Sequence, residues 1–283
     1  MRFAGELTGG WDKVKRRLVS EMLSGIQAAK DVKISNVARS LQESIALIKT
    51  GNRLCRNLAD EDFTERINGT LCWQAGGLVD NDTVLAVDLG DIRKDYAKKM
   101  QHLAGVRDGT TGQIVKGYWL CEVIAARPYD DRIVPLYGEL YSQASEDFES
   151  ENAQLLKAID TVRWASGNRG IFAIDIGGDR RAIIIPLIDR NLSFVIRESG
   201  DRHILLPSGK KCSVRQADRW CKSTETRDVE VEREGRRIDT LVGKLLLVVD
   251  GKLDLVAREP REFRFHNKRF VHSCPKQRFE IQK

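Results

Sequence analysis

Two short apolar runs, each followed by an aspartate, constrain the fold of this 283-residue chain more than any other feature. One run covers residues 170–174 and leads into Asp175. The other covers residues 83–87 and leads into Asp88, and a glycine lies two residues beyond each aspartate. Runs of about five apolar residues with such an end are typical of buried strands. The sequence therefore predicts two buried strands that bring Asp88 and Asp175 to the edge of a sheet.

The two aspartates suit either of two roles. Paired carboxylates at strand ends can hold two divalent cations beside a phosphate, which two-metal phosphoryl transfer requires. An aspartate after a strand is also a common turn former or helix cap. Considered singly, each motif favours the structural role.

The composition indicates a globular protein of one large or two ordinary domains, because 41% of its residues are hydrophobic. No apolar stretch approaches the roughly 18 residues of a membrane span, and the N-terminus lacks the apolar core of a signal peptide. We therefore expect a cytoplasmic protein without a membrane partner. The six cysteines are scattered, with no C-x-x-C pair, so neither a zinc site nor a disulfide framework is expected.

The net charge of +6 is concentrated at one end of the chain. Residues 258–283 contain eight Lys or Arg against three Glu, so the other 257 residues carry a net charge of only +1. Any DNA-binding face in the body of the chain must therefore arise from local segregation of charge.

Residues 11–59 have the apolar spacing of helices. The pattern predicts one helix after Trp11, a second from Ser35 through Ile45 and a third over residues 48–58. The helical pair is open to two interpretations. It is either a helix-turn-helix in which the segment from Ser35 to Thr50 reads DNA through Arg39 and Lys49, or a small bundle with solvated charges. Residues 63–82 lose the helical period, and Gly76-Gly77 followed by Asp80-Asn81-Asp82 marks a loop, so a first domain is placed at 1–76.

The remaining elements predict an α/β fold. Their order is a strand ending at Asp88, strands over 117–126 and 133–137, a helix capped by Ser150, the strand ending at Asp175, a short helix over 183–188 and a strand over 193–197. The helix after Ser150 has one apolar face, formed by Leu155, Leu156, Ile159 and Val162. This order is that of an RNase H-like mixed sheet with flanking helices, in which the first and fourth strands are neighbours. The core is placed at 77–204. A β-rich insertion at 205–250, with a hairpin over 229–238, and a basic, poorly ordered tail at 251–283 are expected to follow.

Several blocks of the core carry a family resemblance. They are Leu85-Ala86-Val87-Asp88-Leu89-Gly90-Asp91-Ile92, Lys94-Asp95-Tyr96-Ala97-Lys98-Lys99-Met100, Gly117-Tyr118-Trp119-Leu120, Pro135-Leu136-Tyr137-Gly138-Glu139-Leu140-Tyr141-Ser142, Ser150-Glu151-Asn152, Ile174-Asp175-Ile176-Gly177-Gly178-Asp179-Arg180-Arg181, Phe194-Val195-Ile196-Arg197 and Gly200-Asp201-Arg202-His203. Together they resemble the IS4-type family of DDE transposases, enzymes of insertion sequences, over roughly residues 78–204.

The resemblance implies DNA cleavage and strand transfer by two divalent metals, Mg²⁺ or Mn²⁺, held between two Asp and one Glu. Asp88 would be the first metal ligand and Asp175 the second, while Asp91 and Asp179 are assigned to turn and helix-start structure. The implied partner is double-stranded DNA, both transposon ends and target. A homodimer and pairing with a full-length transposase are both left open.

The third carboxylate of the family lies in a helical signature of Tyr, Arg, Glu and Lys. No tyrosine follows Tyr141, and the tail glutamates Glu259, Glu262 and Glu280 lie in no helical pattern. The resemblance thus implies a shortened or frameshifted transposase that is weak or inactive, since a two-carboxylate site holds metal poorly.

Two other functions remain open. One is a non-catalytic, inhibitory DNA-binding fragment of a transposase. The other is a relative of actin-like ATPases and sugar kinases, whose phosphate-binding turns resemble the segments after Asp88 and Asp175 because glycine lets the backbone approach a phosphate closely.

Overall fold

The computed structural model describes residues 2–127 and 131–197, together with seven short strands beyond residue 202. Contacts divide the chain into two compact units, residues 1–74 and 75–283. Most of the predicted insertion and tail, 205–250 and 251–283, lies outside the described residues. In the described part of the chain, no helix is long and apolar enough to cross a membrane.

The first unit is helical. Its helices are α1 (Arg2–Leu7), α2 (Lys13–Ala29), α3 (Ile34–Ser40), α4 (Leu47–Ala59) and α5 (Thr64–Gly76), the last of which runs into the second unit. Helix α2 begins at Asp12, whose side chain accepts hydrogen bonds from the N–H groups of Val14 and Lys15. Leu18 of α2 and Leu54 of α4 are fully buried in the core of the first unit. Trp11 stacks on Phe63 with ring centroids 5.3 Å apart.

The prediction of one helix from Ser35 through Ile45 is wrong. Helix α3 ends at Ser40, Gln42 has a φ of 48°, and a new helix begins at Leu47. The cause is tertiary. The Glu43 carboxylate accepts hydrogen bonds from Thr50 and Arg53, which hold the intervening segment as a turn and lower the pKa of Glu43. Arg39 and Lys49 therefore lie on different helices and do not form one recognition helix.

The loss of period after Phe63 conceals a helix, because α5 occupies residues 64–76, and the loop marked by Gly77 and residues 80–82 follows it. The Asp62 carboxylate accepts a hydrogen bond from the Thr64 N–H at 2.9 Å, a local helix-start signal. The helix has a weak apolar period, which explains why its pattern did not reveal it.

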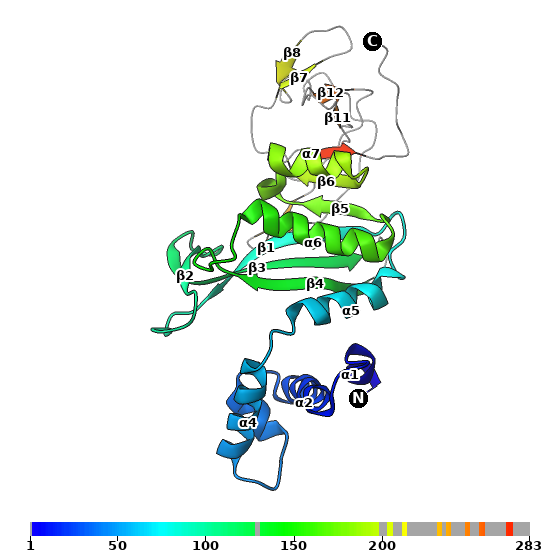
Figure 1. The fold of residues 1–283 in the computed structure, drawn as a ribbon. Helices are drawn as coiled ribbons and strands as arrows, with labels where there is room; N and C mark the ends of the chain where they lie inside the picture. The colour runs from blue at the N-terminus through cyan, green and yellow to red at the C-terminus, as the bar shows by residue number, and fades with distance from the viewer. Residues whose placement is uncertain are drawn as a thin grey trace. The chain divides into compact units, whose positions relative to one another are not determined.

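The second unit is built on one seven-stranded mixed sheet (Figure 1). Its strands are β1 (Val84–Arg93), β2 (Ala104–Arg107), β3 (Ile114–Ala126), β4 (Ile133–Tyr141), β5 (Ile171–Ile174), β6 (Ser193–Arg197) and β13 (Phe270–Ser273). Strand β1 is antiparallel to β3 and parallel to β5; β4 adds to β3 antiparallel and β6 adds to β5 parallel. The core order β4-β3-β1-β5-β6 is that of an RNase H-like sheet, as the sequence predicts.

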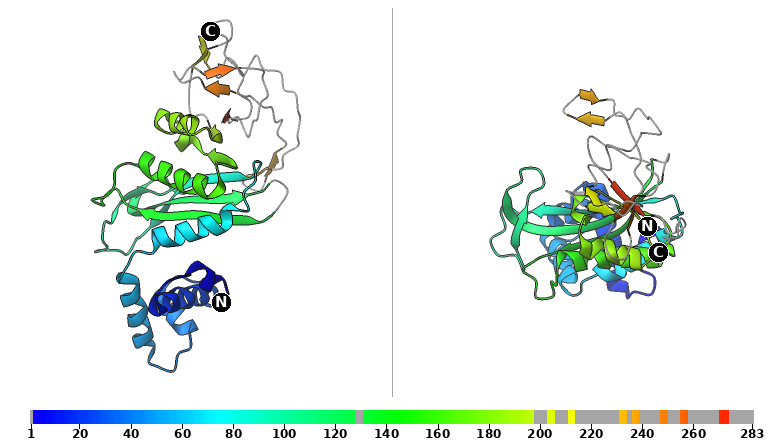
Figure 2. Two further views of the ribbon diagram at one scale, coloured as in Figure 1. Left: turned by 45° about the vertical axis from the view of Figure 1, so that its right-hand side comes forward. Right: turned by 90° about the horizontal axis from the view of Figure 1, so that it is seen from above.

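Two helices of the second unit lie where the sequence predicts them. Helix α6 (Glu151–Ser166) begins at Ser150, whose hydroxyl accepts from the Ala153 N–H, and α7 (Arg181–Asp189) precedes β6. Helix α6 lies across one face of the sheet in Figure 1 and Figure 2 and packs on β3 and β4. Its buried residues include Leu155, Ile159 and Val162, the face that the sequence predicts.

Beyond this core, the structure describes a four-stranded sheet and a hairpin. The sheet consists of β7 (His203–Leu205), β8 (Lys211–Ser213), β11 (Leu247–Val249) and β12 (Leu255–Ala257); the hairpin pairs β9 (Val231–Arg233) with β10 (Arg236–Ile238). The hairpin predicted over 229–238 is confirmed. Strands β12 and β13 lie inside the segment that was predicted as an unstructured tail.

We expect Asp160→Asn to destabilise the second unit. Asp160 of α6 accepts two hydrogen bonds from Arg190, at 2.7 and 2.8 Å, and one from Arg163 at 2.6 Å. Burial alone would raise the pKa of Asp160, but these hydrogen bonds outweigh it and hold the pKa below 3.8. The variant should lose about 1–2 kcal/mol of unfolding free energy at pH 7, measured by urea denaturation.

The pH dependence follows from the direction of that shift. A lowered folded-state pKa contributes stability above the unfolded value, and this stability is lost as pH falls through the folded value. The difference between parent and variant should therefore persist at pH 5 and shrink below about pH 4. Glu6→Gln, which removes a surface pair with the exposed Arg2, is the control and should change nothing measurable. An equal difference at pH 3 and pH 7 would contradict this account.

Candidate functional site

The structure brings Asp88 and Asp175 side by side. Val87 of β1 is in register with Ile174, the last residue of β5. Asp88 is the next residue of β1, and Asp175 directly follows the end of β5. Neighbouring strands lie about 4.8 Å apart, so each aspartate follows a residue that is about one strand spacing from its partner. This juxtaposition results from the parallel pairing of the first and fourth core strands.

Both aspartates are exposed. Val87 and Ile174 are buried, whereas Asp88 and Asp175 are exposed. Because side chains alternate between the faces of a strand, Asp88 points to the opposite side of the sheet from Val87. The apolar face therefore anchors the two strands while the carboxylates remain open to solvent.

Asp175 also has a structural role. It is the N-cap of the 3₁₀ turn η1 (Ile176–Gly178), and its Oδ1 accepts a hydrogen bond from the Gly177 N–H at 2.7 Å. A Cβ at Gly177 would lie 2.9 Å from that oxygen, so glycine is needed for the close approach. The cap interpretation is confirmed for Asp175, and the cap fixes the direction of its carboxylate.

The region around Asp88 is not a turn. Strand β1 continues past Asp88 to Arg93, and Gly90 is paired with Leu120 of β3. The prediction that this strand ends at Asp88 is wrong, because β3 is 13 residues long and supplies pairing partners well beyond it. Backbone groups in a strand ladder are not arranged as a phosphate-binding turn. The first of the two turns required by the actin-like hypothesis is therefore absent at Asp88-Leu89-Gly90.

A further carboxylate, Glu122, lies across from Asp88 in the antiparallel pairing of β1 and β3, and it is exposed. Glu122 is not recognisable from the sequence as a site residue, because nothing in the run around it reveals which residue of β1 it faces. Burial, and then the charges of Glu139, Asp88 and Glu122, raise the pKa of the Cys121 thiol to about 12. Negative charge is thus concentrated on the central strands.

These carboxylates form a row and do not converge. Glu122 and Asp175 lie on either side of Asp88, two strand spacings or about 10 Å apart. Among the residues that the structure describes, no group of three His, Cys, Asp or Glu is arranged to hold a metal ion. The tail glutamates Glu259, Glu262 and Glu280 lie outside the described residues.

Asp91 and Asp179 have the structural positions assigned to them. The Asp91 Oδ1 accepts a hydrogen bond from the Gly109 N–H at 2.9 Å and so holds the turn between β2 and β3. Asp179 lies between η1 and Arg180, the N-cap of α7. Arg180 hydrogen-bonds Asn152 at 3.1 Å and Glu151, which ties the start of α6 to the turn after Asp175.

Comparisons with known proteins add little. No family model matches the chain, and no curated protein matches it. Among solved structures, a chain of a Mos1 transposase paired-end complex with left transposon end is similar, at 16% identity and a TM-score of 0.24. The match covers 62% of this chain and 57% of that chain. The RNase H-like fold follows from the strand order of the sheet.

We expect Gly170→Ala to disturb the alignment of the two aspartates. Gly170 precedes β5 with a φ of 94°, and a Cβ there would lie 2.7 Å from the Leu85 Cδ1 of β1. The left-handed backbone and the clash together should cost about 2–4 kcal/mol of unfolding free energy, measured by urea denaturation. Gly138→Ala is the matched control, since a Cβ at Gly138 meets nothing within 4 Å. A neutral Gly170→Ala would show that this contact does not set the approach of β5 to β1.

Proposed function

We propose that this chain is a transposase-like protein that cuts DNA, and joins the cut end to target DNA, at a divalent-metal site on Asp88 and Asp175. The observation that carries the proposal is the position of the two aspartates directly after Val87 and Ile174, an in-register pair on neighbouring parallel strands of an RNase H-like sheet. The resemblance of the surrounding segments to IS4-type DDE transposases supports it.

The two aspartates fit a divalent cation in part. Mg²⁺ and Mn²⁺ prefer carboxylate oxygens, and the exposed carboxylates of Asp88 and Asp175 supply them from adjacent strands. When bound, the cations would activate a water or 3′ hydroxyl and neutralise charge on the leaving oxygen. Without them, Asp88, Asp175 and the neighbouring Glu122 would repel a DNA phosphate. The residues' own contribution is a fixed pair of ligands, with Asp175 oriented by its hydrogen bond to Gly177.

The described residues supply no converging third carboxylate. A site of two carboxylates holds a metal weakly and positions it loosely, and poor positioning alone can reduce a rate about 100-fold. We therefore propose slow catalysis. The same observation favours a second candidate, a DNA-binding transposase fragment without catalytic activity.

The proposal predicts nicking of supercoiled plasmid by the full chain in Mn²⁺ or Mg²⁺, with conversion to open circles measured on agarose gels. Asp88→Asn and Asp175→Asn should each reduce the rate at least about 100-fold. Asparagine at position 175 can still accept the Gly177 hydrogen bond, so the loss would report the carboxylate charge and not the cap.

Asp82→Asn is the matched control, because Asp82 is an exposed aspartate just before β1. It should nick at the parent rate. Circular dichroism of all three variants checks that they fold. No nicking by the parent, with DNA binding retained, would favour the non-catalytic fragment. Equal nicking by parent and both site variants would refute the assigned site.

A further inference from the structure

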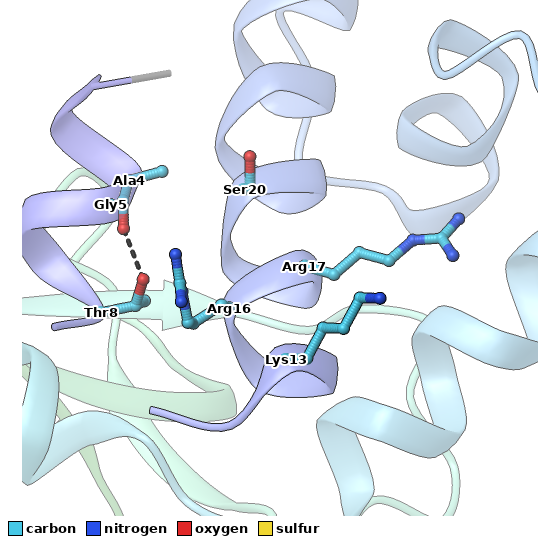
Figure 3. A pocket seen from close by; sticks show the side chains of 7 residues that line it. All are labelled: Ala4, Gly5, Thr8, Lys13, Arg16, Arg17 and Ser20. Atoms are coloured by element: carbon cyan, nitrogen blue, oxygen red, sulfur yellow. Dashed lines mark hydrogen bonds between the residues drawn. The ribbon is translucent and has the colours of Figure 1, made fainter. Parts of the chain in front are cut away.

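A groove between α1 and α2 of the first unit carries exposed positive charge (Figure 3). We call it the α1–α2 groove; its volume is about 520 Å³, and it is lined by Ala4, Gly5, Thr8, Lys13, Arg16, Arg17 and Ser20. The last four are spaced i, i+3, i+4 and i+7, which places them on one face of α2. Figure 3 shows Arg16 extending into the space between the two helices, and Lys13 and Arg17 extending from α2.

Of the three cationic side chains that line the groove, only Arg17 forms an ion pair within the described residues. Arg17 forms ion pairs with Glu21 at 2.6 Å and Glu43 at 2.7 Å. Lys13 and Arg16 are exposed and make no ion pair within the described part of the chain. Residues 1–74 contain twelve Lys or Arg against nine Asp or Glu, a net charge of +3, and Lys13 and Arg16 place two of these cations next to each other on one face of α2.

The rest of the groove suits close approach of an anion. Gly5 is exposed, and a Cβ there would meet nothing within 4 Å, so the α1 wall is open. The Thr8 hydroxyl donates to the Ala4 carbonyl at 2.6 Å and is therefore part of the wall. The groove lies at the start of the 17-residue α2, where the helix dipole favours negative charge. An open wall with exposed cations fits a polymer backbone better than a small anion that must be enclosed.

We propose that the α1–α2 groove binds the phosphate backbone of double-stranded DNA through Lys13 and Arg16. This inference deepens the proposed function, on which it rests for the identity of the polymer. It places DNA contact on α2, away from the Arg39 and Lys49 face that the sequence pattern suggested. Backbone contacts of this kind position DNA and carry no sequence information.

The test is binding of the full chain to a fluorescein-labelled 30-base-pair duplex, by fluorescence anisotropy in EDTA from 50 to 250 mM KCl. The Lys13→Gln/Arg16→Gln variant should bind at least about tenfold more weakly at 100 mM KCl, and the slope of log affinity against log salt should fall by about 2. Arg39→Gln/Lys49→Gln removes the same charge from the same unit and should stay within about twofold of the parent.

A second pair of variants adds a negative charge to the protein and removes no cation. Gly5→Glu puts a carboxylate in the α1–α2 groove and should weaken binding, whereas Gly69→Glu should not, although Gly69 is also an exposed helical glycine with open space at its Cβ. Unchanged binding of Lys13→Gln/Arg16→Gln, or an equal loss in Arg39→Gln/Lys49→Gln, would overturn the inference. So would displacement of the duplex by 1 mM inorganic phosphate, which would indicate a small-anion site.

Binding is measured in EDTA, which removes divalent metal and prevents cleavage. The DNA-binding proposal for the α1–α2 groove and the nuclease proposal can therefore be refuted independently. Nicking that depends on Asp88 and Asp175, with normal binding by the groove variants, would overturn the groove and leave the nuclease. Loss of binding in the groove variants, with no nicking by any chain, would support the groove and refute the nuclease. No binding of the parent at 50 mM KCl would overturn both.

Discussion

The pairing of β1 on both sides is the constraint on which the rest of the second unit depends. Strand β1 is held by antiparallel hydrogen bonds to β3 and by parallel hydrogen bonds to β5. Because side chains alternate along a strand, a slip of one residue would turn Asp88 into the core and Val87 out to solvent. Burial of Leu85 and Val87 therefore keeps the carboxylate on the open face.

The same pairing places Glu122 and Asp88 on adjacent strands, with Asp175 directly after the neighbouring β5. Burial, and then the charges of Glu139, Asp88 and Glu122, raise the pKa of the Cys121 thiol. A phosphate could approach that row only with cations bound. The exposed cations Lys13 and Arg16 lie in the other compact unit. The two proposals thus assign DNA chemistry and DNA holding to different units.

Several features were predictable because their causes are local. Apolar runs predicted the core strands, and their order predicted the sheet. The Ser150 cap and the spacing of Leu155 and Ile159 predicted α6. Asp88 and Asp175 stood out because each directly follows such a run. The turn between Ser40 and Leu47 was not predictable, since Arg53, a distant partner in sequence, holds Glu43 there.

The sequence by itself determined most of the core strands and helix α6, and it singled out two aspartates, because periodicity and capping act over a few residues. Only the tertiary structure decided that Asp88 lies within a ten-residue strand, that Glu122 faces it and that Arg16 opens onto a groove beside α1. Register and helix packing join residues far apart in the chain. They are selected by the burial of whole apolar faces, which no local pattern encodes.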